Sequence, residues 1–216
     1  MRAVAGRQTE RVPVIPTTPD ALVDRIVDLV VARPGRVRLV VDGAPATEPD
    51  RLADALVDPL RAAGRAALRV PAAGFWRPAS IRLEHGRQDA LAYLEDWLDE
   101  GALAREVLTP LAHDGTGRFL PSLWDPVRDR ATRAAYEQTP EAAVLVVDGS
   151  MLLGRGLAFD LAVHLTVRPT TLARRTPPQD AWTLEAFELY EARADPTGVS
   201  DLVVRVDDPR HPAVVI

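Results

Sequence analysis

Two short apolar runs that each end in Asp-Gly constrain the fold of this chain most strongly. Val37–Val41 leads into Asp42-Gly43, and Ala143–Val147 leads into Asp148-Gly149. Arg38 interrupts the first run, whereas Ala143–Val147 is continuously apolar, which is typical of a strand buried on both faces, as in a parallel sheet covered by helices. Further strands are expected over 66–70, 161–167 and 202–206. Because these runs alternate with helical patterns, the chain predicts a three-layer α/β fold with a mostly parallel sheet flanked by helices.

Helical signals fill the segments between the strands. Thr17–Asp20 combines a hydroxyl cap, a proline in the first turn and an acid near the positive end of the helix dipole. These residues open a leading helix expected over 17–35, after a loose N-terminal segment over 1–16. Further helices are expected from about 50 to 64, where Pro59 should introduce a kink, and over 87–111, 170–175 and 184–194. The segment 115–139 is expected to be irregular.

Length and composition limit the classes of protein that fit. At 216 residues and 47% apolar, the chain can bury one full core, so 1–216 is expected to form a single domain. Lysine, asparagine and cysteine are all absent, which codon bias in a GC-rich genome explains. Their absence excludes disulfides, zinc–thiolate sites, cysteine nucleophiles and Schiff-base lysines.

Charge and hydropathy narrow the expected partners and location. A net charge of −5 argues against a nucleic-acid-binding surface, which would need clustered positive charge. Arg7, Glu10 and Arg11 interrupt the N-terminus, so it lacks the apolar core of a signal peptide. No apolar stretch is long enough to span a bilayer. We therefore expect a cytoplasmic protein with no membrane partner, and homodimer formation stays open.

The connection between the first buried strand and the next helix has the length of a phosphate-binding loop, G-x-x-x-x-G-K-[ST]. It reads Gly43-Ala-Pro-Ala-Thr-Glu-Pro-Asp50, so only the first glycine of that motif is kept. No lysine can serve here, because all 26 basic residues of the chain are arginines. The length and position of the loop therefore indicate a phosphate-loop fold, whereas the residues that would bind phosphate and magnesium are missing.

Taken together, these segments resemble the uridine kinase-like P-loop kinases, the nucleoside kinase group related to phosphoribulokinase. The resemblance covers most of the chain and rests on the order and spacing of the segments Val37–Gly43, Leu52–Leu56, Gly74–Pro78, Val144–Gly149 and Asp201–Val204. It implies the P-loop NTPase-like α/β fold. For an active member it also implies ATP and Mg²⁺ as cofactors.

The resemblance assigns roles to the loop residues, and several of those roles are lost. In the family, loop N–H groups cradle phosphate, a lysine reaches the outer phosphates and a hydroxyl binds magnesium. Here Glu48 takes the position of the second glycine, Pro49 that of the lysine and Asp50 that of the hydroxyl. Glu48 adds negative charge, and Pro49 removes both a backbone donor and the ammonium group. The residues left to contact a nucleotide are Gly43, Thr47, Asp50 and Arg51.

The resemblance also indicates that the catalytic base is missing. The family's aspartate precedes the phenylalanine of its D-x-F-[YW] segment by two residues, and that position is Ala73 in this chain. What remains is Asp148, which matches the acid that helps place magnesium. Arg174 and Arg175 lie where the family has the lid arginines that stabilise the transferring charge.

Residues for substrate binding follow from the same comparison. Aromatic faces accept nucleobases, so Phe75 and Trp76, with Arg77, and the segment Trp124, Asp125 and Arg128 are the expected nucleoside contacts. Each has a simpler interpretation: the aromatic rings could cover an edge of the core, and Asp125 and Arg128 could form a surface ion pair. Trp97 could line the same stacking pocket, but its helical spacing favours the core, and His164 on an apolar strand is interpreted as a core or half-buried histidine.

The missing groups decide the expected function. Losing a positioned base costs about 10²–10⁴-fold in rate, and losing a preorganised charge donor costs about 10²–10³-fold. We therefore predict a pseudokinase that keeps a cleft for a nucleoside or nucleotide ligand. One alternative is an active kinase in which Arg51, Arg174 or Arg175 replaces the lysine. The other is a structural or interaction protein whose cleft has collapsed.

Overall fold

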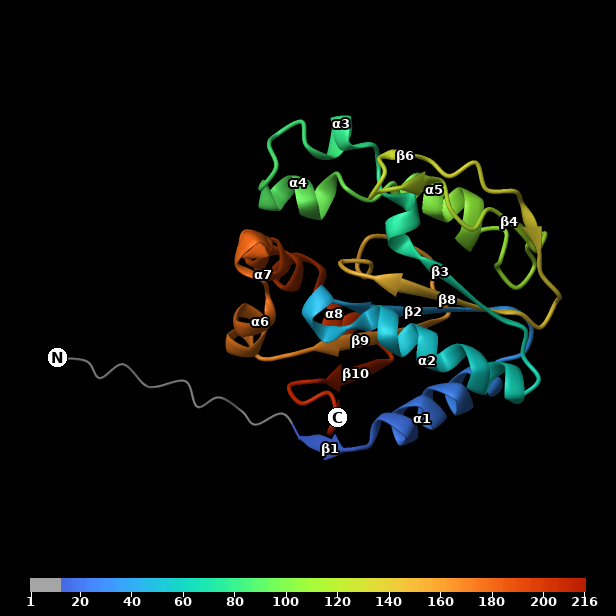
Figure 1. The fold of residues 1–216 in the computed structure, drawn as a ribbon. Coiled ribbons are helices and arrows are strands. Elements are labelled where there is room, and N and C mark those ends of the chain that lie inside the picture. The colour runs from blue at the N-terminus through green and yellow to red at the C-terminus, as the bar shows by residue number, and fades with distance from the viewer. Residues whose placement is uncertain (1–12) are drawn as a thin grey trace.

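A seven-stranded, mostly parallel sheet forms the centre of the molecule, in a computed structural model that describes residues 13–216 (Figure 1). The strand order is β1-β11-β10-β9-β2-β8-β3. The parallel strands are β2 (Val37–Gly43), β3 (Ala67–Pro71), β8 (Val144–Gly149), β9 (Leu161–Thr166) and β10 (Leu202–Arg205). β2 lies between β8 and β9, and all three are almost wholly buried, as the apolar runs predict. The expected three-layer α/β fold is confirmed.

Helices cover both faces of the sheet. α1 (Pro19–Val31) and α2 (Pro49–Ala62) pack on one face, where Ile26 and Leu56 are fully buried. The other face carries α4 (Ala90–Glu95), α5 (Glu100–Leu103) and α7 (Thr183–Ala194). Leu103 and Phe187 are buried in the apolar cluster on that side. The sheet thus separates two apolar clusters.

Capping residues explain where several helices begin. Thr18 caps α1 as the sequence predicts, since its hydroxyl accepts the N–H of Ala21 at 3.2 Å. The helix expected over 87–111 is instead divided into α4, α5 and the π-helical segment η3 (Ala104–Leu108). Asp89 and Asp99 each accept a backbone N–H three residues ahead, at 2.7 and 2.8 Å. Each aspartate therefore starts a new helix, a preference that the apolar periodicity concealed.

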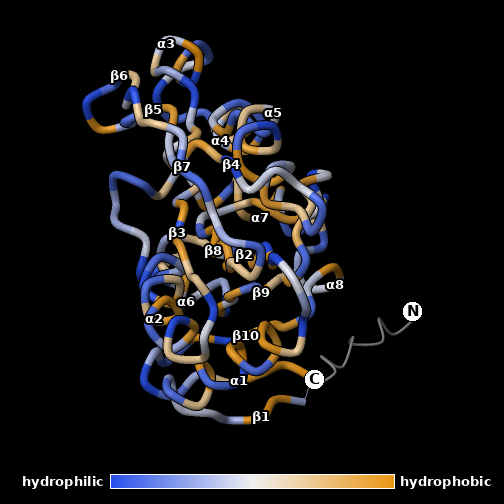
Figure 2. Tube along the Cα trace, turned by 90° about the vertical axis from the view of Figure 1, so that its right-hand side faces the viewer, coloured by the Kyte–Doolittle hydropathy of each residue, from blue (hydrophilic) through white to orange (hydrophobic). Residues whose placement is uncertain are grey.

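The remaining elements are short and lie mostly at the ends of the sheet. They are η1 (Pro45–Thr47), η2 (Ala72–Phe75), α3 (Ala79–Arg82), β4 (Arg118–Phe119), β5 (Trp124–Asp125), β6 (Arg130–Ala131), β7 (Glu137–Gln138), α6 (Pro169–Arg175), η4 (Pro178–Asp180) and α8 (Pro196–Val199). The segment 115–139, expected to be irregular, thus contains two small antiparallel pairs. The β5–β6 hairpin projects from the body of the molecule (Figure 2).

Part of the N-terminal segment that was expected to be loose forms a strand. Residues 1–12 lie outside the described part of the chain, whereas Val14–Pro16 forms β1. β1 pairs antiparallel with β11 (Ala213–Val215), a C-terminal strand that the sequence pattern did not indicate. Strands of three residues are too short to show alternation, so their pairing could be seen only in the fold. Within residues 13–216, no helix combines the length and apolar character needed to cross a membrane.

Candidate functional site

The carboxyl ends of β2, β3 and β8 meet at one edge of the sheet, which is where ligands bind in open α/β folds. Two cavities lie above this edge, with volumes of about 610 Å³ and about 280 Å³. They adjoin, because Pro45, Trp76, Tyr93 and Trp97 line both of them. We call this pair of cavities the aromatic cleft. Its larger part lies in the size range of small-molecule sites.

Four aromatic side chains form the wall of the aromatic cleft: Tyr93 on α4, Trp76 just after η2, Trp97 just after α4 and Trp182 just before α7. The ring centroids of Trp76 and Trp97 are 5.1 Å apart, and Tyr93 lies 4.7 Å from Trp97 and 5.5 Å from Trp182. The Trp76–Trp97, Tyr93–Trp97 and Tyr93–Trp182 pairs meet edge to face, the arrangement that aromatic quadrupoles favour. Burial raises the pKa of Tyr93 to about 12, so its hydroxyl stays protonated at neutral pH. The wall therefore offers flat apolar faces and one hydroxyl donor.

The aromatic cleft gathers only some of the residues expected to bind a nucleoside. Trp76 lines it, but Phe75 is 0% exposed and belongs to the core, because its ring is on the inward side of η2. Arg77 serves the backbone: its N–H donates to the carbonyl of Trp97 at 2.8 Å, and its own carbonyl accepts from Arg82.

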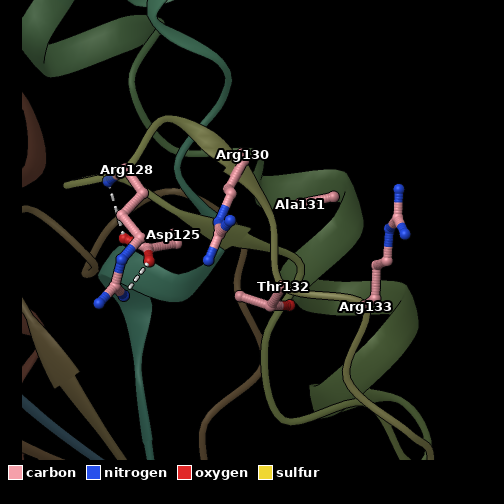
Figure 3. Close-up of a pocket in the computed structure, with 6 residues that line it drawn as sticks. All are labelled: Asp125, Arg128, Arg130, Ala131, Thr132 and Arg133. Carbon is pink, nitrogen blue, oxygen red and sulfur yellow. Dashed lines mark hydrogen bonds and ion pairs between the residues drawn. The ribbon is translucent and has the colours of Figure 1, made fainter.

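Trp124, Asp125 and Arg128 lie on the β5–β6 hairpin instead. Asp125 accepts from the Arg128 guanidinium at 2.9 Å and from the Arg128 backbone N–H at 3.0 Å, the surface ion pair that was the simpler interpretation. Both residues line a separate cavity of about 550 Å³, into which Arg130 also projects (Figure 3). The structure therefore does not bring the hairpin residues together with the aromatic cleft.

Tyr93 received no role from the sequence, and Trp97, a possible stacking residue, was interpreted as leaning to the core because of its helical spacing. The two are four residues apart, a spacing that puts both on one side of a helix. Trp97 is partly buried against the core and also lines both cavities. Trp182, far along the chain, carried no local signal. An aromatic count on each expected helix face would have found the first pair but not Trp182.

The loop after β2 is folded upon itself. It forms the 3₁₀ turn η1, in which the N–H of Thr47 donates to the carbonyl of Ala44 at 2.8 Å and that of Glu48 to the carbonyl of Pro45 at 3.0 Å. The Thr47 hydroxyl also donates to the Ala44 carbonyl. Pro45 and Pro49 have no N–H. Most donors that would cradle a phosphate are therefore used within the loop or lacking.

Both glycine positions of the loop motif keep their conformational role. A Cβ on Gly43 would collide with the Thr47 hydroxyl, so the tight turn needs glycine there. Glu48, at the position of the second glycine, has φ 56° and ψ 54°, a left-handed backbone that glycine adopts most easily. The Glu48 side chain is exposed and lies 3.4 Å from Arg51. The loop backbone thus follows the course of a phosphate loop, but the negatively charged Glu48 would repel a phosphate there.

The expected lid arginines have different surroundings. Arg175 donates to the carbonyls of Val206 at 3.0 Å and Asp207 at 2.6 Å, and it lies 3.4 Å from the carbonyl of Ala46. Arg174 is exposed on the last turn of α6. Arg175 therefore ties the loop to the end of β10, although it also lines the larger cavity. Asp50, in contrast, lines the smaller cavity directly.

Asp148 faces a guanidinium from the neighbouring strand. Its two oxygens accept from Arg69 Nε at 2.7 Å and from Arg69 Nη2 at 2.8 Å, and Arg69 Nη1 donates to Asp54 at 2.7 Å. A magnesium ligand needs a free carboxylate lone pair facing the ion. As placed, the residues fit a magnesium ion poorly, since Arg69 uses one lone pair of each Asp148 oxygen and its positive charge opposes a second cation there. In residues 13–216 no cluster of three or more His, Asp or Glu side chains is arranged to hold a metal.

A buried polar network lies beneath the loop. Asp42, 0% exposed, accepts from the N–H of Leu152 at 2.8 Å, from the hydroxyl of Tyr190 at 3.0 Å and from His164 Nδ1 at 2.8 Å. Burial opposes a charge on His164, but the bonds to Asp42 and Glu191 outweigh it and raise the pKa of His164 to about 9. His164 is thus a core histidine, as its place on an apolar strand indicated. Asp42 is a structural anchor here.

Comparison with known proteins supports the fold. The chain matches no protein-family model, and no curated protein matches it by sequence. It is similar to the structure of a possible uridine kinase from Bacillus stearothermophilus, with 17% identity and a TM-score of 0.70 over 85% of this chain and 97% of that one. It is also similar to a candidate fructose transport system kinase from Silicibacter, with 25% identity and a TM-score of 0.61 over 85% and 95%. The fold is that of the uridine kinase-like P-loop kinases.

Proposed function

We propose that this protein binds a nucleoside or a similar planar ligand in the aromatic cleft and does not transfer a phosphoryl group efficiently. The observation that carries the proposal is the contrast at one edge of the sheet. An open cavity of about 610 Å³ walled by Trp76, Tyr93, Trp97 and Trp182 lies beside a phosphate loop that bonds to itself. The structures that it resembles include a possible uridine kinase, whose name points to a nucleoside as the class of ligand.

Several groups needed for transfer are lacking or engaged elsewhere. Pro49 and Ala73 stand at the positions of the loop lysine and of the base, and Asp148 is bound by Arg69. Arg51 lies beside Glu48, and Arg175 donates to backbone carbonyls. Of the three arginines that could replace the lysine in an active kinase, Arg51 and Arg175 thus have other partners, and the exposed Arg174 is left. This geometry disfavours the active-kinase alternative, and the volume of the aromatic cleft disfavours a collapsed one.

The role of such a protein would be binding or regulation. Aromatic faces hold a base by stacking, at about 1–3 kcal/mol for each base, without needing phosphate contacts. The expected nucleoside contacts on the hairpin, Trp124, Asp125 and Arg128, enter this proposal only if the β5–β6 hairpin closes over the ligand. Trp76, Tyr93, Trp97 and Trp182 carry it as the structure stands.

The test is a thermal-shift panel of nucleosides, nucleoside monophosphates, ATP and GTP, each with and without Mg²⁺. A ligand at 100 times its Kd adds about 2.7 kcal/mol to the free energy of unfolding, which raises the melting temperature measurably. We expect a shift with at least one nucleoside and no added shift with Mg²⁺. A shift confined to ATP with Mg²⁺, together with steady-state turnover, would overturn the proposal. The absence of any shift would favour the interaction-protein alternative.

A further inference from the structure

Arg69 is a charged side chain bound to two carboxylates, one of which lines the aromatic cleft, and neither the sequence nor the fold comparison gave it a role. It lies on β3, where its guanidinium makes a two-bond contact with Asp148 on β8 and a third bond with Asp54 on α2. The Asp148 side chain is 5% exposed and that of Arg69 is 23% exposed. Such a planar, bidentate pair between nearly buried partners is among the stronger ion pairs that proteins form.

The sheet fixes the relative position of Arg69 and Asp148, which lie on neighbouring strands. β3 and β8 are parallel neighbours, with Arg69 beside Val146 and Pro71 beside Asp148. Asp148 lines the smaller cavity of the cleft, whereas Arg69 approaches its carboxylate from the α2 face. Asp148 and Asp54 both raise the pKa of Arg69, while burial opposes this, so the guanidinium is permanently charged. The carboxylate at the floor of the cleft therefore has a fixed counter-ion.

This arrangement has a consequence for metal ions. A divalent ion at Asp148 would have to replace two charge-assisted hydrogen bonds and leave the guanidinium without its main partner, close to a second positive charge. Magnesium also loses its water shell reluctantly, so a partly engaged carboxylate is a poor ligand for it. The free energy of the folded protein is therefore expected to be lower with Arg69 as the partner of Asp148 than with a divalent ion there.

We propose that Arg69 is a resident cation that takes the place of a divalent metal ion at Asp148 and so makes ligand binding in the aromatic cleft independent of metal. It also selects the class of ligand: nucleosides and other uncharged planar molecules are accepted, whereas polyphosphates, which would carry a metal ion with them, are not. Both effects on ligand binding rest on the proposed function, but the replacement of a metal ion at Asp148 by Arg69 does not.

The first arm of the test measures metal binding by the wild-type protein and needs no nucleoside. Mn²⁺ serves as the probe, followed by electron paramagnetic resonance and by the melting temperature. We expect no protein-bound Mn²⁺ signal that depends on Asp148 and no melting shift. A bound signal in wild type that Asp148→Asn removes would overturn the proposal, whatever the variants of Arg69 show.

The second arm removes the cation. In Arg69→Met, which keeps the length of the side chain, Asp148 loses its counter-ion and the protein should melt at a lower temperature. Mn²⁺ should then raise that temperature, and Arg69→Met combined with Asp148→Asn should show no such response. Arg69→Lys keeps a positive charge and is expected to remain insensitive to Mn²⁺. Arg210→Met, whose side chain is 86% exposed beside Asp208, is the control and should behave as wild type.

The results for the variants decide between the replacement of a metal ion by Arg69 and its absence, whether or not a nucleoside binds. Restoration of the folded state or of the melting temperature of Arg69→Met by Mn²⁺ supports the proposal. If Arg69→Met is folded but does not respond to Mn²⁺, or if it stays unfolded with Mn²⁺ present, the proposal that one cation replaces the other is wrong. A failure of nucleosides to bind leaves these results unchanged and counts only against the proposed function.

Discussion

The loop after β2 and the aromatic cleft adjoin, and Pro45 belongs to both. They differ in what remains available to a ligand: the polar groups of the loop are bonded to one another, whereas the aromatic side chains of the cleft face open volume. In the loop, backbone N–H groups and the Thr47 hydroxyl bond within the turn. In the cleft, the aromatic side chains border open volume. The loop residues that would handle phosphate and the side chains that border the cavity are thus different residues, so a fold of this kind can vary one set without the other. The proposed binding of a planar ligand therefore does not require a working phosphate loop.

The largest effect is expected beneath the loop. Asp42→Ala removes the acceptor of three buried donors, from Leu152, His164 and Tyr190. Breaking a buried charged network from one side costs about 3–5 kcal/mol, so the urea midpoint at neutral pH should fall sharply. The control is Asp58→Ala, whose side chain is 92% exposed and whose loss should change stability little. Equal effects of the two variants would show that Asp42 is not the anchor of this region.

In the aromatic cleft the informative response is binding, measured well below the melting temperature of each variant, because Trp97 also packs against the core. Trp97→Ala removes a stacking face, and a loss of about 1–3 kcal/mol corresponds to about five- to 150-fold weaker nucleoside binding. Trp124→Ala, on the β5–β6 hairpin, is the matched control, since its indole N–H donates to Asp129 at 3.0 Å outside the aromatic cleft. Tryptophan-fluorescence titration measures both. A larger loss in Trp124→Ala would move the site to the hairpin.

A dependence on pH is expected from the buried network alone. The pKa of His164 is raised from its ordinary value to about 9 in the folded protein. A group whose pKa is raised by folding stabilises the protein fully below its unfolded pKa of about 6.5 and loses that contribution as the pH rises through the folded value. Urea unfolding should therefore show declining stability between about pH 6.5 and pH 9. His164→Gln should lack this decline, and an unchanged profile in that variant would contradict the assignment.

The smallest effect concerns the strained loop residue. Glu48→Gly should raise stability by up to about 1 kcal/mol, because a left-handed backbone costs a residue with a Cβ about 1–2 kcal/mol and glycine nothing comparable. The same substitution in helix α7, Glu185→Gly, should lower stability by about 0.5–1 kcal/mol. Thermal unfolding compares the two. A loss of stability in Glu48→Gly would mean that the Glu48 side chain, and not the backbone, holds the turn.

The sequence predicted the parallel strands because buried strands carry a continuous apolar signal, and the loop because its length is preserved between Gly43 and Asp50. It could not predict the aromatic wall, since Trp182 reaches Tyr93 only through the packing of α7 against α4. Arg69 was missed for a similar reason. Its partners are on another strand and a helix, and a single charge within an apolar strand gives no local sign of either.

The aromatic cleft is proposed to recognise a nucleoside, and the loop after β2 is proposed to contribute no affinity for the phosphates of a nucleotide. The most direct test is a calorimetric titration of the wild-type protein with uridine and with UTP, each with and without Mg²⁺. We predict that UTP with Mg²⁺ binds no more tightly than uridine and that Mg²⁺ leaves the uridine Kd unchanged. Binding of UTP with Mg²⁺ that is tenfold or more tighter, a difference of about 1.4 kcal/mol, would show that the loop still binds phosphate and would contradict the account.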